Sequence, residues 1–147
     1  MALTFKLFSD AALTSEQVGD IVATQAADGS SDPVILTLYF GSLGSAGGDT
    51  ADRKLEAESA PGVDDVFLTI VDATPGSGHL PAEVKLSLTS GGLASATPGA
   101  PLNLGVPVLS GTSNKKTIWI EVDDATGIVG TETDLSFDTV LVRETDV

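Results

Sequence analysis

One stretch of seven residues indicates the fold class of this chain most clearly: EVKLSLT, residues 83–89. Its apolar residues Val84, Leu86 and Leu88 alternate with polar ones. A period of two places alternate side chains on opposite faces of a β-strand. We therefore expect a strand with one face toward an apolar core and the other toward water.

Comparable short runs recur along the chain, separated by turns rich in Gly, Pro, Asp and Ser, and almost no run reads as a long helix. The further strand candidates are residues 3–8, 18–24, 33–40, 53–58, 66–71, 106–109, 117–122 and 135–143. This spacing predicts an all-β fold, a single-domain β-sandwich of Ig-like or jelly-roll type over residues 1–147. The Gly- and Pro-rich segments 41–52 and 90–103 are expected to be long loops, the first of them the most mobile.

Two parts of the second half resemble each other. The strand candidates 66–71 and 117–122 both run into turns rich in Asp, Thr and Gly, and each is followed by another strand candidate, 83–89 and 135–143 respectively. Two related hairpins, one in each sheet, would produce this pattern. Turn chemistry alone would also produce it, because Asp and Thr side chains bond nearby backbone amides and Gly tolerates positive φ.

Composition narrows the function classes. The chain has 147 residues, no cysteine and a net charge of −14. The electrostatic field of this negative charge repels phosphate groups and anionic lipid. We therefore expect no direct binding of nucleic acid and no membrane association. The first residues show no basic segment followed by an apolar one, which predicts a protein without signal peptide or membrane span, made in a cytoplasm. Hydrophobic residues make up 41% of the chain, which fits either a well-filled sandwich or a surface covered by another subunit.

Catalytic equipment is sparse. His79 is the single histidine and there is no cysteine, so a zinc site built on the usual three or four such ligands is not expected. The sequence contains no G-x-S-x-G elbow that would present a nucleophilic serine. We therefore predict a protein that is not an enzyme and uses no cofactor, with His79 as a turn residue.

Calcium is the inorganic ligand for which the chain offers most oxygen atoms. Its candidate ligands are adjacent or nearby aspartates at strand ends: Asp64 with Asp65, Asp123 with Asp124, and Asp134 with Asp138. No twelve-residue EF-hand loop accompanies them, and aspartates at strand ends are commonly turn residues. The prediction is therefore that no metal is bound.

The candidate interface centres on Trp119. In residues 117–122 the side chains of Ile118, Ile120 and Val122 share one face, so Trp119 and Glu121 lie on the other. An amphipathic ring on an outer face commonly anchors an interface. Tyr39 and Phe67 complete the predicted interface set, although a covering loop such as 90–103 is the alternative explanation for Trp119.

Scattered phrases over most of the chain resemble small virion proteins of tailed bacteriophages. These are residues 5–14, 53–57, 61–64, 77–79, 83–86, 102–105 and 122–127. The resemblance implies a structural subunit located in the virion, a head decoration or cement protein with a β-sandwich fold that binds the capsid lattice. Within the same setting, a tail, baseplate or fibre-associated subunit is the alternative.

The resemblance also implies partners: the major capsid protein or other virion subunits, and further copies of this chain in a homo-oligomer, for example a trimer. A hypothesis of a different class is an Ig-like module that binds carbohydrate or a cell surface. Such a module usually presents aromatic side chains on its loops, and this chain has only one tryptophan, one tyrosine and five phenylalanines. Solution mass separates an assembly protein from a monomeric module.

Overall fold

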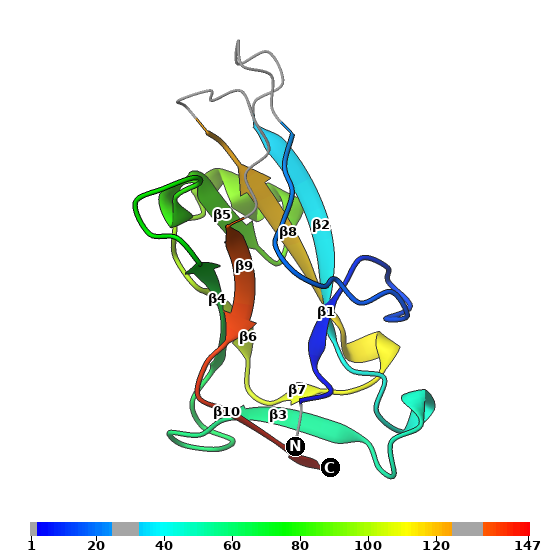
Figure 1. Ribbon diagram of the computed structural model, residues 1–147. Helices are drawn as coiled ribbons and strands as arrows, with labels where there is room; N and C mark the ends of the chain where they lie inside the picture. The colour runs from blue at the N-terminus through cyan, green and yellow to red at the C-terminus, as the bar shows by residue number, and fades with distance from the viewer. Residues whose placement is uncertain (1–2, 25–32, 125–133) are drawn as a thin grey trace.

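The computed structural model describes residues 3–24, 33–124 and 134–147. In these residues ten strands form three antiparallel sheets, shown in Figure 1. The front sheet has the order β1 (Lys6–Phe8), β2 (Val34–Gly41), β8 (Lys116–Val122), β5 (Val84–Ser87). The back sheet has the order β6 (Leu102–Gly105), β4 (Val66–Asp72), β9 (Leu135–Thr139). The end sheet has the order β10 (Val142–Asp146), β3 (Arg53–Ala57), β7 (Val108–Leu109).

Four short 3₁₀ helices lie between the strands: η1 (Gly44–Gly47), η2 (Pro81–Glu83), η3 (Ser90–Ser95) and η4 (Thr112–Asn114). Thus η1 lies within the predicted loop 41–52, and η3 lies within the predicted loop 90–103, whose last two residues belong to β6. No helix in the described part of the chain is long and apolar enough to cross a membrane.

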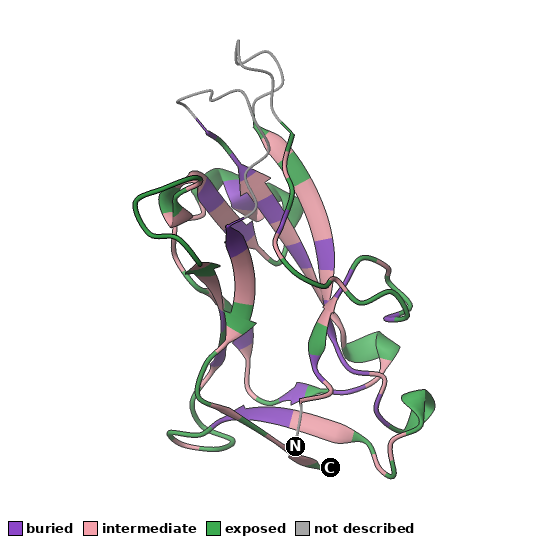
Figure 2. Ribbon diagram, in the orientation of Figure 1, coloured by how far each residue is buried: buried purple, intermediate pink, exposed green. Residues whose placement is uncertain are grey.

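One apolar core joins all three sheets, and alternation along the strands creates it. In β8, Ile118, Ile120 and Val122 are buried while the residues between them are half-buried. Burying each such side chain fully contributes about 1.5–3 kcal/mol. Figure 2 shows most of the buried residues on the strands and the exposed ones mainly on the turns. The core residues outside β8 include Leu38, Phe40, Val84 and Leu86 of the front sheet, Val66, Leu68, Leu104 and Leu135 of the back sheet, and Leu55 and Val108 of the end sheet.

The all-β prediction is confirmed. Strands form within the expected ranges 33–40, 53–58, 66–71, 83–89 and 117–122, with boundaries that differ by one or two residues. In 83–89 the strand ends at Ser87, so Leu88 is not part of the buried face that its spacing predicts; its side chain is exposed. The choice between an Ig-like and a jelly-roll sandwich stays a prediction.

The prediction of one strand over residues 135–143 is wrong. The chain forms β9 in the back sheet and then β10 in the end sheet. Leu141, between them, has φ 53°, a left-handed conformation that breaks an extended strand. The polypeptide therefore changes sheets at residues 140–141.

The two related hairpins, one of the two explanations for the similar turns, do not form. The strand β4 pairs with β9, and β5 pairs with β8, so each strand pairs with a strand of the other expected hairpin. The pairs β4–β9 and β5–β8 bring the apolar faces of these strands together in the core, and the residues of the local turns do not specify this pairing. The second of the two similar turns, residues 123–127, lies largely outside the described residues.

Residues 18–24 form no strand, contrary to the prediction. Gly19 has φ +83°, which interrupts the run. The amide of Ile21 donates to the Leu135 carbonyl at 2.8 Å, and the Ile21 side chain is buried in the core. Of the apolar residues that suggested a strand there, Ile21 and Ala23 pack in or against the core, whereas Val18 and Val22 are exposed.

Candidate functional site

An apolar groove lies where the end sheet meets the back sheet. It has a volume of about 340 Å³ and is lined by Ala57, Ser59, Asp64, Asp65, Val66, Phe67, Val140, Leu141 and Val142. Three of these side chains are large, apolar and exposed: Phe67 by 41%, Val140 by 58% and Leu141 by 75%. We call these three residues the apolar rim. Phe67, predicted from sequence as an interface residue, belongs to it.

The backbone holds the apolar rim in place. Leu141 adopts a left-handed conformation that costs a residue with a Cβ about 1–2 kcal/mol. Its carbonyl accepts a hydrogen bond of 2.7 Å from the amide of Glu58, at the end of β3. This link fixes the turn between β9 and β10, with a leucine presented to water at a position where glycine is the usual choice.

The other three predicted interface residues lie together on the outer face of the front sheet. In register, Tyr39 pairs with Thr117, Trp119 lies between Thr37 and Ser87, and Glu121 pairs with Lys85. Glu121 is engaged within the chain, because the Lys85 ammonium donates to its carboxylate at 2.6 Å. The apolar rim is at a different place, on the back and end sheets, so the four residues do not form one patch.

Part of that outer face is covered by the chain itself. The helix η3 packs against β5 and β8. A Cβ on Gly92 of η3 would lie only 2.2 Å from the Ser87 hydroxyl oxygen, so the helix backbone lies directly on this side of the sheet. Trp119, next to Ser87 in register, is half-buried rather than exposed. The alternative of a covering loop therefore accounts for part of its environment, and its role in an interface stays a prediction.

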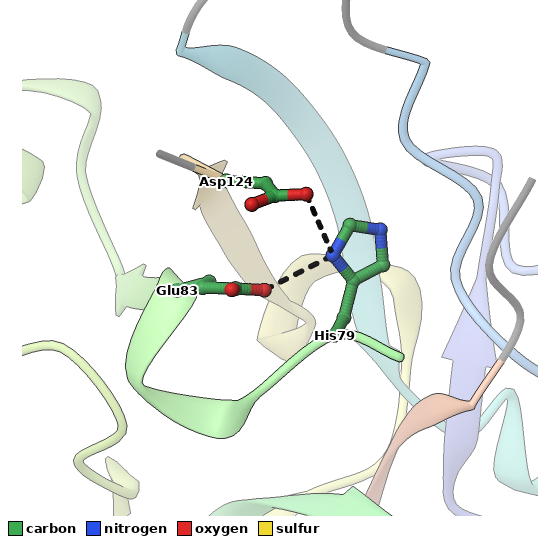
Figure 3. A group of neighbouring side chains, drawn as sticks. All are labelled: His79, Glu83 and Asp124. Carbon is green, nitrogen blue, oxygen red and sulfur yellow. Dashed lines mark hydrogen bonds and ion pairs between the residues drawn. The ribbon is translucent and has the colours of Figure 1, made fainter. Parts of the chain in front are cut away.

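A cluster of three side chains that bear ionisable groups lies at the end of the β5–β8 pair (Figure 3). The Nδ1 atom of His79 is 3.0 Å from Glu83 Oε2 and 4.0 Å from Asp124 Oδ2. One candidate ligand atom from each residue lies within 4.8 Å of the others. All three side chains are largely buried. Among the described residues, this is the group of His, Asp and Glu side chains that is compact enough to hold a metal ion.

Backbone hydrogen bonds bring these three residues together. Beyond the last paired residues, Val84 and Val122, the amide of Asp123 donates to the Glu83 carbonyl at 2.9 Å and sets Asp124 beside Glu83. The Glu83 carboxylate in turn accepts the amide of Leu80 at 3.0 Å, which holds the turn that carries His79. The three side chains thus come from two parts of the chain, His79 and Glu83 from the β4–β5 connection and Asp124 from the segment after β8.

Asp134 fixes the segment before His79. Its carboxylate accepts the His79 amide at 3.3 Å and the Thr74 hydroxyl at 3.3 Å. Gly78 allows this approach, because it has φ +72° and a Cβ there would lie 2.3 Å from an Asp134 oxygen. The turn between β4 and η2 is therefore anchored on both sides of His79.

The aspartate pairs named as calcium ligands serve other purposes in the structure. Asp64 accepts the Ser59 hydroxyl at 2.6 Å, and Asp65 accepts the Asn103 side-chain amide at 2.6 Å. Asp138 caps the Thr139 amide, while its predicted partner Asp134 holds the turn of His79. Asp124 is buried in the cluster of Figure 3 and Asp123 is exposed. Within the described ranges, none of these pairs forms a convergent group of ligands.

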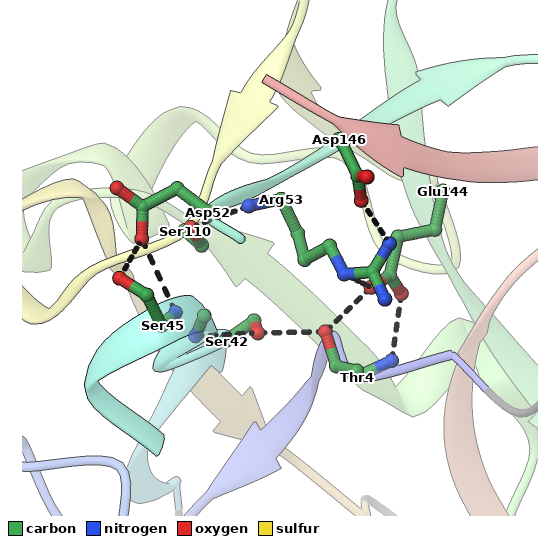
Figure 4. Close-up of polar contacts among 9 residues, drawn as sticks. Thr4, Ser42, Ser45, Asp52, Arg53, Ser110, Glu144 and Asp146 are labelled. Atoms are coloured by element: carbon green, nitrogen blue, oxygen red, sulfur yellow. Dashed lines mark hydrogen bonds and ion pairs between the residues drawn. The ribbon is translucent and has the colours of Figure 1, made fainter. Parts of the chain in front are cut away.

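A second polar network closes the end of the molecule near the termini (Figure 4). The Thr4 amide and hydroxyl both donate to the Glu144 carboxylate at 2.7 Å. The Arg53 guanidinium lies 3.7 Å from Glu144 and also pairs with Asp146. These contacts tie the start of the chain to β10 and β3, so the network stabilises the fold.

Two exposed carboxylates have shifted pKa values. Hydrogen bonds from the Ser45 hydroxyl and amide lower the pKa of Asp52, which appears in Figure 4. The Ser15 amide, with contributions from Thr14 and Ala12, lowers the pKa of Asp10. Both groups stabilise turns, since donors directed at a carboxylate favour its charged form.

From the sequence, His79 was interpreted as a turn residue and Asp124 was named, with Asp123, as a candidate calcium ligand; Glu83 was not singled out. The residues Glu83 and Asp124 meet only because β5 pairs with β8, and the sequence suggested other pairings. No protein-family model, curated protein or solved structure matches this chain.

Proposed function

We propose that this protein is a non-enzymatic structural subunit of a bacteriophage virion, a decoration or cement protein that binds the capsid lattice. The observation that carries the proposal is the apolar rim of Phe67, Val140 and Leu141. The sequence resemblance to small virion proteins of tailed phages supports the same function. Attachment to a repeating protein surface requires apolar side chains that are exposed and held in a fixed position. The backbone of this all-β chain holds the apolar rim in that way.

The energetics of the apolar rim favour a role in binding a partner over a role in stabilising the fold. Leu141 keeps a costly backbone conformation while its side chain contributes little to the core. Covering the exposed part of a leucine side chain with a partner contributes about 1–2 kcal/mol. Phe67 and Val140 add apolar area beside it, and a small number of such residues is what dominates typical protein interfaces.

Charge suggests the chemistry of the partner. Asp64 and Asp65 line the groove beside the apolar rim, and the whole chain carries −14. A second copy placed against this groove would oppose like charges. The occupant that we propose is a capsid subunit with an apolar projection flanked by Lys or Arg side chains. Self-association, for example as a trimer, then uses another surface, and the outer face with Tyr39 and Trp119 is the proposed place.

The experiment uses particles of the phage that encodes the chain. Particles are purified from a strain that lacks this gene, mixed with the purified protein and sedimented, and bound copies are counted by quantitative mass spectrometry. The proposal predicts saturable binding to heads at a fixed ratio to the capsid subunit. Binding to isolated tails instead of heads would support the alternative of a tail subunit, and binding to neither would overturn the proposal.

A pair of variants assigns the surface. Leu141→Asp places a charge on the apolar rim and is expected to abolish sedimentation with heads. Val18→Asp makes the same kind of change at another exposed apolar residue and is expected to bind like the wild type. Equal loss in both variants, with both folded by circular dichroism, would show that the groove is not the binding surface.

A further inference from the structure

We propose that His79, Glu83 and Asp124 bind one divalent transition-metal ion of the zinc class, which fastens the turn before β5 to the end of β8. The three residues offer one imidazole nitrogen and two carboxylate groups directed at a common region (Figure 3). This proposal does not depend on the virion function. It concerns a site that a sequence search for several histidines or cysteines would pass over.

The separations of the ligand atoms fit a single ion. Ligand atoms held 2.0–2.2 Å from a tetrahedral zinc ion lie about 3.4 Å apart. In the protein, His79 Nδ1 lies 3.0 Å from Glu83 Oε2 and 4.0 Å from Asp124 Oδ2. The two carboxylate oxygens lie within 4.8 Å of each other, so changes of up to about 1.4 Å, within reach of side-chain rotation, bring all three atoms to coordination distance. Three protein ligands leave the fourth position of a tetrahedral ion to water.

The donor set selects the metal. Calcium and magnesium prefer sites made entirely of oxygen atoms, whereas an imidazole nitrogen favours zinc and its neighbours among the transition metals. Two carboxylates compensate the charge of the dication in a largely buried place. The net charge of −14 raises the local concentration of cations around the protein.

The surrounding hydrogen bonds prepare the site. Asp134 orients the backbone at His79, and the Leu80 amide orients the Glu83 carboxylate. Bonds of this kind to the segments that carry ligands reduce the freedom that the ligands lose on coordination. His79 and Glu83 come from the β4–β5 connection, and Asp124 is the second residue after the end of β8. One ion therefore joins segments that are distant in sequence.

The test uses the untagged full chain, freed of metal with a chelator, and Zn²⁺ as the probe. His79 is the single histidine, so imidazole ¹⁵N resonances in the wild-type protein report on this residue alone. We expect Zn²⁺ to shift these resonances with a stoichiometry of one, and Ca²⁺ at the same concentration to leave them unchanged. At a Zn²⁺ concentration 100 times the dissociation constant, the melting temperature should rise by about 8 °C.

Isosteric variants separate coordination from folding. His79→Gln and Asp124→Asn should each weaken Zn²⁺ binding by about 100-fold or more, as measured by competition with a chromogenic chelator. Asp123→Asn is the matched control. It removes the same charge from the neighbouring side chain, which is exposed, and should change the affinity for Zn²⁺ less than about 2-fold. The proposal is overturned if about 1 mM Zn²⁺ leaves the His79 resonances of the folded wild type unchanged. It is also overturned if Asp123→Asn weakens binding as much as Asp124→Asn.

Discussion

Leu141→Gly tests whether the apolar rim is built for binding rather than for folding. Leu141 has φ 53° and its side chain is 75% exposed. Glycine removes about 1–2 kcal/mol of backbone strain. Against this, glycine gives the unfolded chain more backbone conformational entropy, which lowers the stability of the folded state by about 0.5–1 kcal/mol. The buried quarter of the leucine side chain accounts for about 0.5 kcal/mol more. At the midpoints of these ranges the terms nearly cancel, so the free energy of unfolding should change by only about 0.3 kcal/mol, equivalent to about 1 °C in melting temperature.

Leu13→Gly is the matched control, because Leu13 has φ 59° and is 1% exposed. The backbone terms are the same, but the substitution also empties a buried site, which costs about 2–5 kcal/mol. Its melting temperature should fall by at least about 4 °C. Calorimetry measures both variants, and sedimentation with phage heads measures binding, which Leu141→Gly should weaken about 10-fold. If Leu141→Gly melts as early as Leu13→Gly, the leucine serves the fold and the reasoning fails.

Three further predictions concern the core, acid stability and association. Ile120→Ala should lower the free energy of unfolding by about 2–5 kcal/mol in a urea titration, because Ile120 is fully buried. Ile35→Ala, on the exposed face of the same sheet, should lower it by under about 1 kcal/mol. Similar losses in the two variants would contradict the assignment of Ile120 to the core. Asp10 and Asp52 have folded pKa values below the ordinary 3.8, so the stability that they contribute is present above pH 3.8 and is lost as pH falls through the folded pKa. Melting curves between pH 5 and pH 2 should therefore show a smaller acid loss in Asp52→Asn, and an unchanged slope in that variant would refute its role. Copies that carry −14 each repel, so self-association should strengthen from about 0.05 to about 0.5 M salt in sedimentation equilibrium, and weaker association at high salt would contradict an apolar contact.

The sequence predicted individual strands well because alternation is a local property. In β8 the residues Ile118, Ile120 and Val122 alternate with polar or aromatic ones, and the structure buries those three. The same reasoning identified β2 and β4. It failed at residues 18–24, where Ile21 is buried in the core without pairing in a sheet and Val18 and Val22 are exposed.

Strand pairing was not predictable by the same means. Nothing local distinguishes the pairs β4–β9 and β5–β8 from the two hairpins that were expected. The break at Leu141 was also hidden, because a leucine gives no signal of a left-handed backbone. The two features that the sequence did not predict create the two candidate sites. The pairing of β5 with β8 brings Glu83 to Asp124, and the break at Leu141 exposes Val140 and Leu141. Phe67 was identified from sequence, but its neighbours in the apolar rim were not.

The most direct measurement of the central claim is a cryo-electron microscopy map of phage heads to which the purified protein has been added. The account predicts density for the chain on the outer surface of the shell, with Phe67, Val140 and Leu141 against a capsid subunit and basic side chains of that subunit near Asp64 and Asp65. A map in which the chain is attached by another surface, with Phe67, Val140 and Leu141 facing solvent, would contradict it.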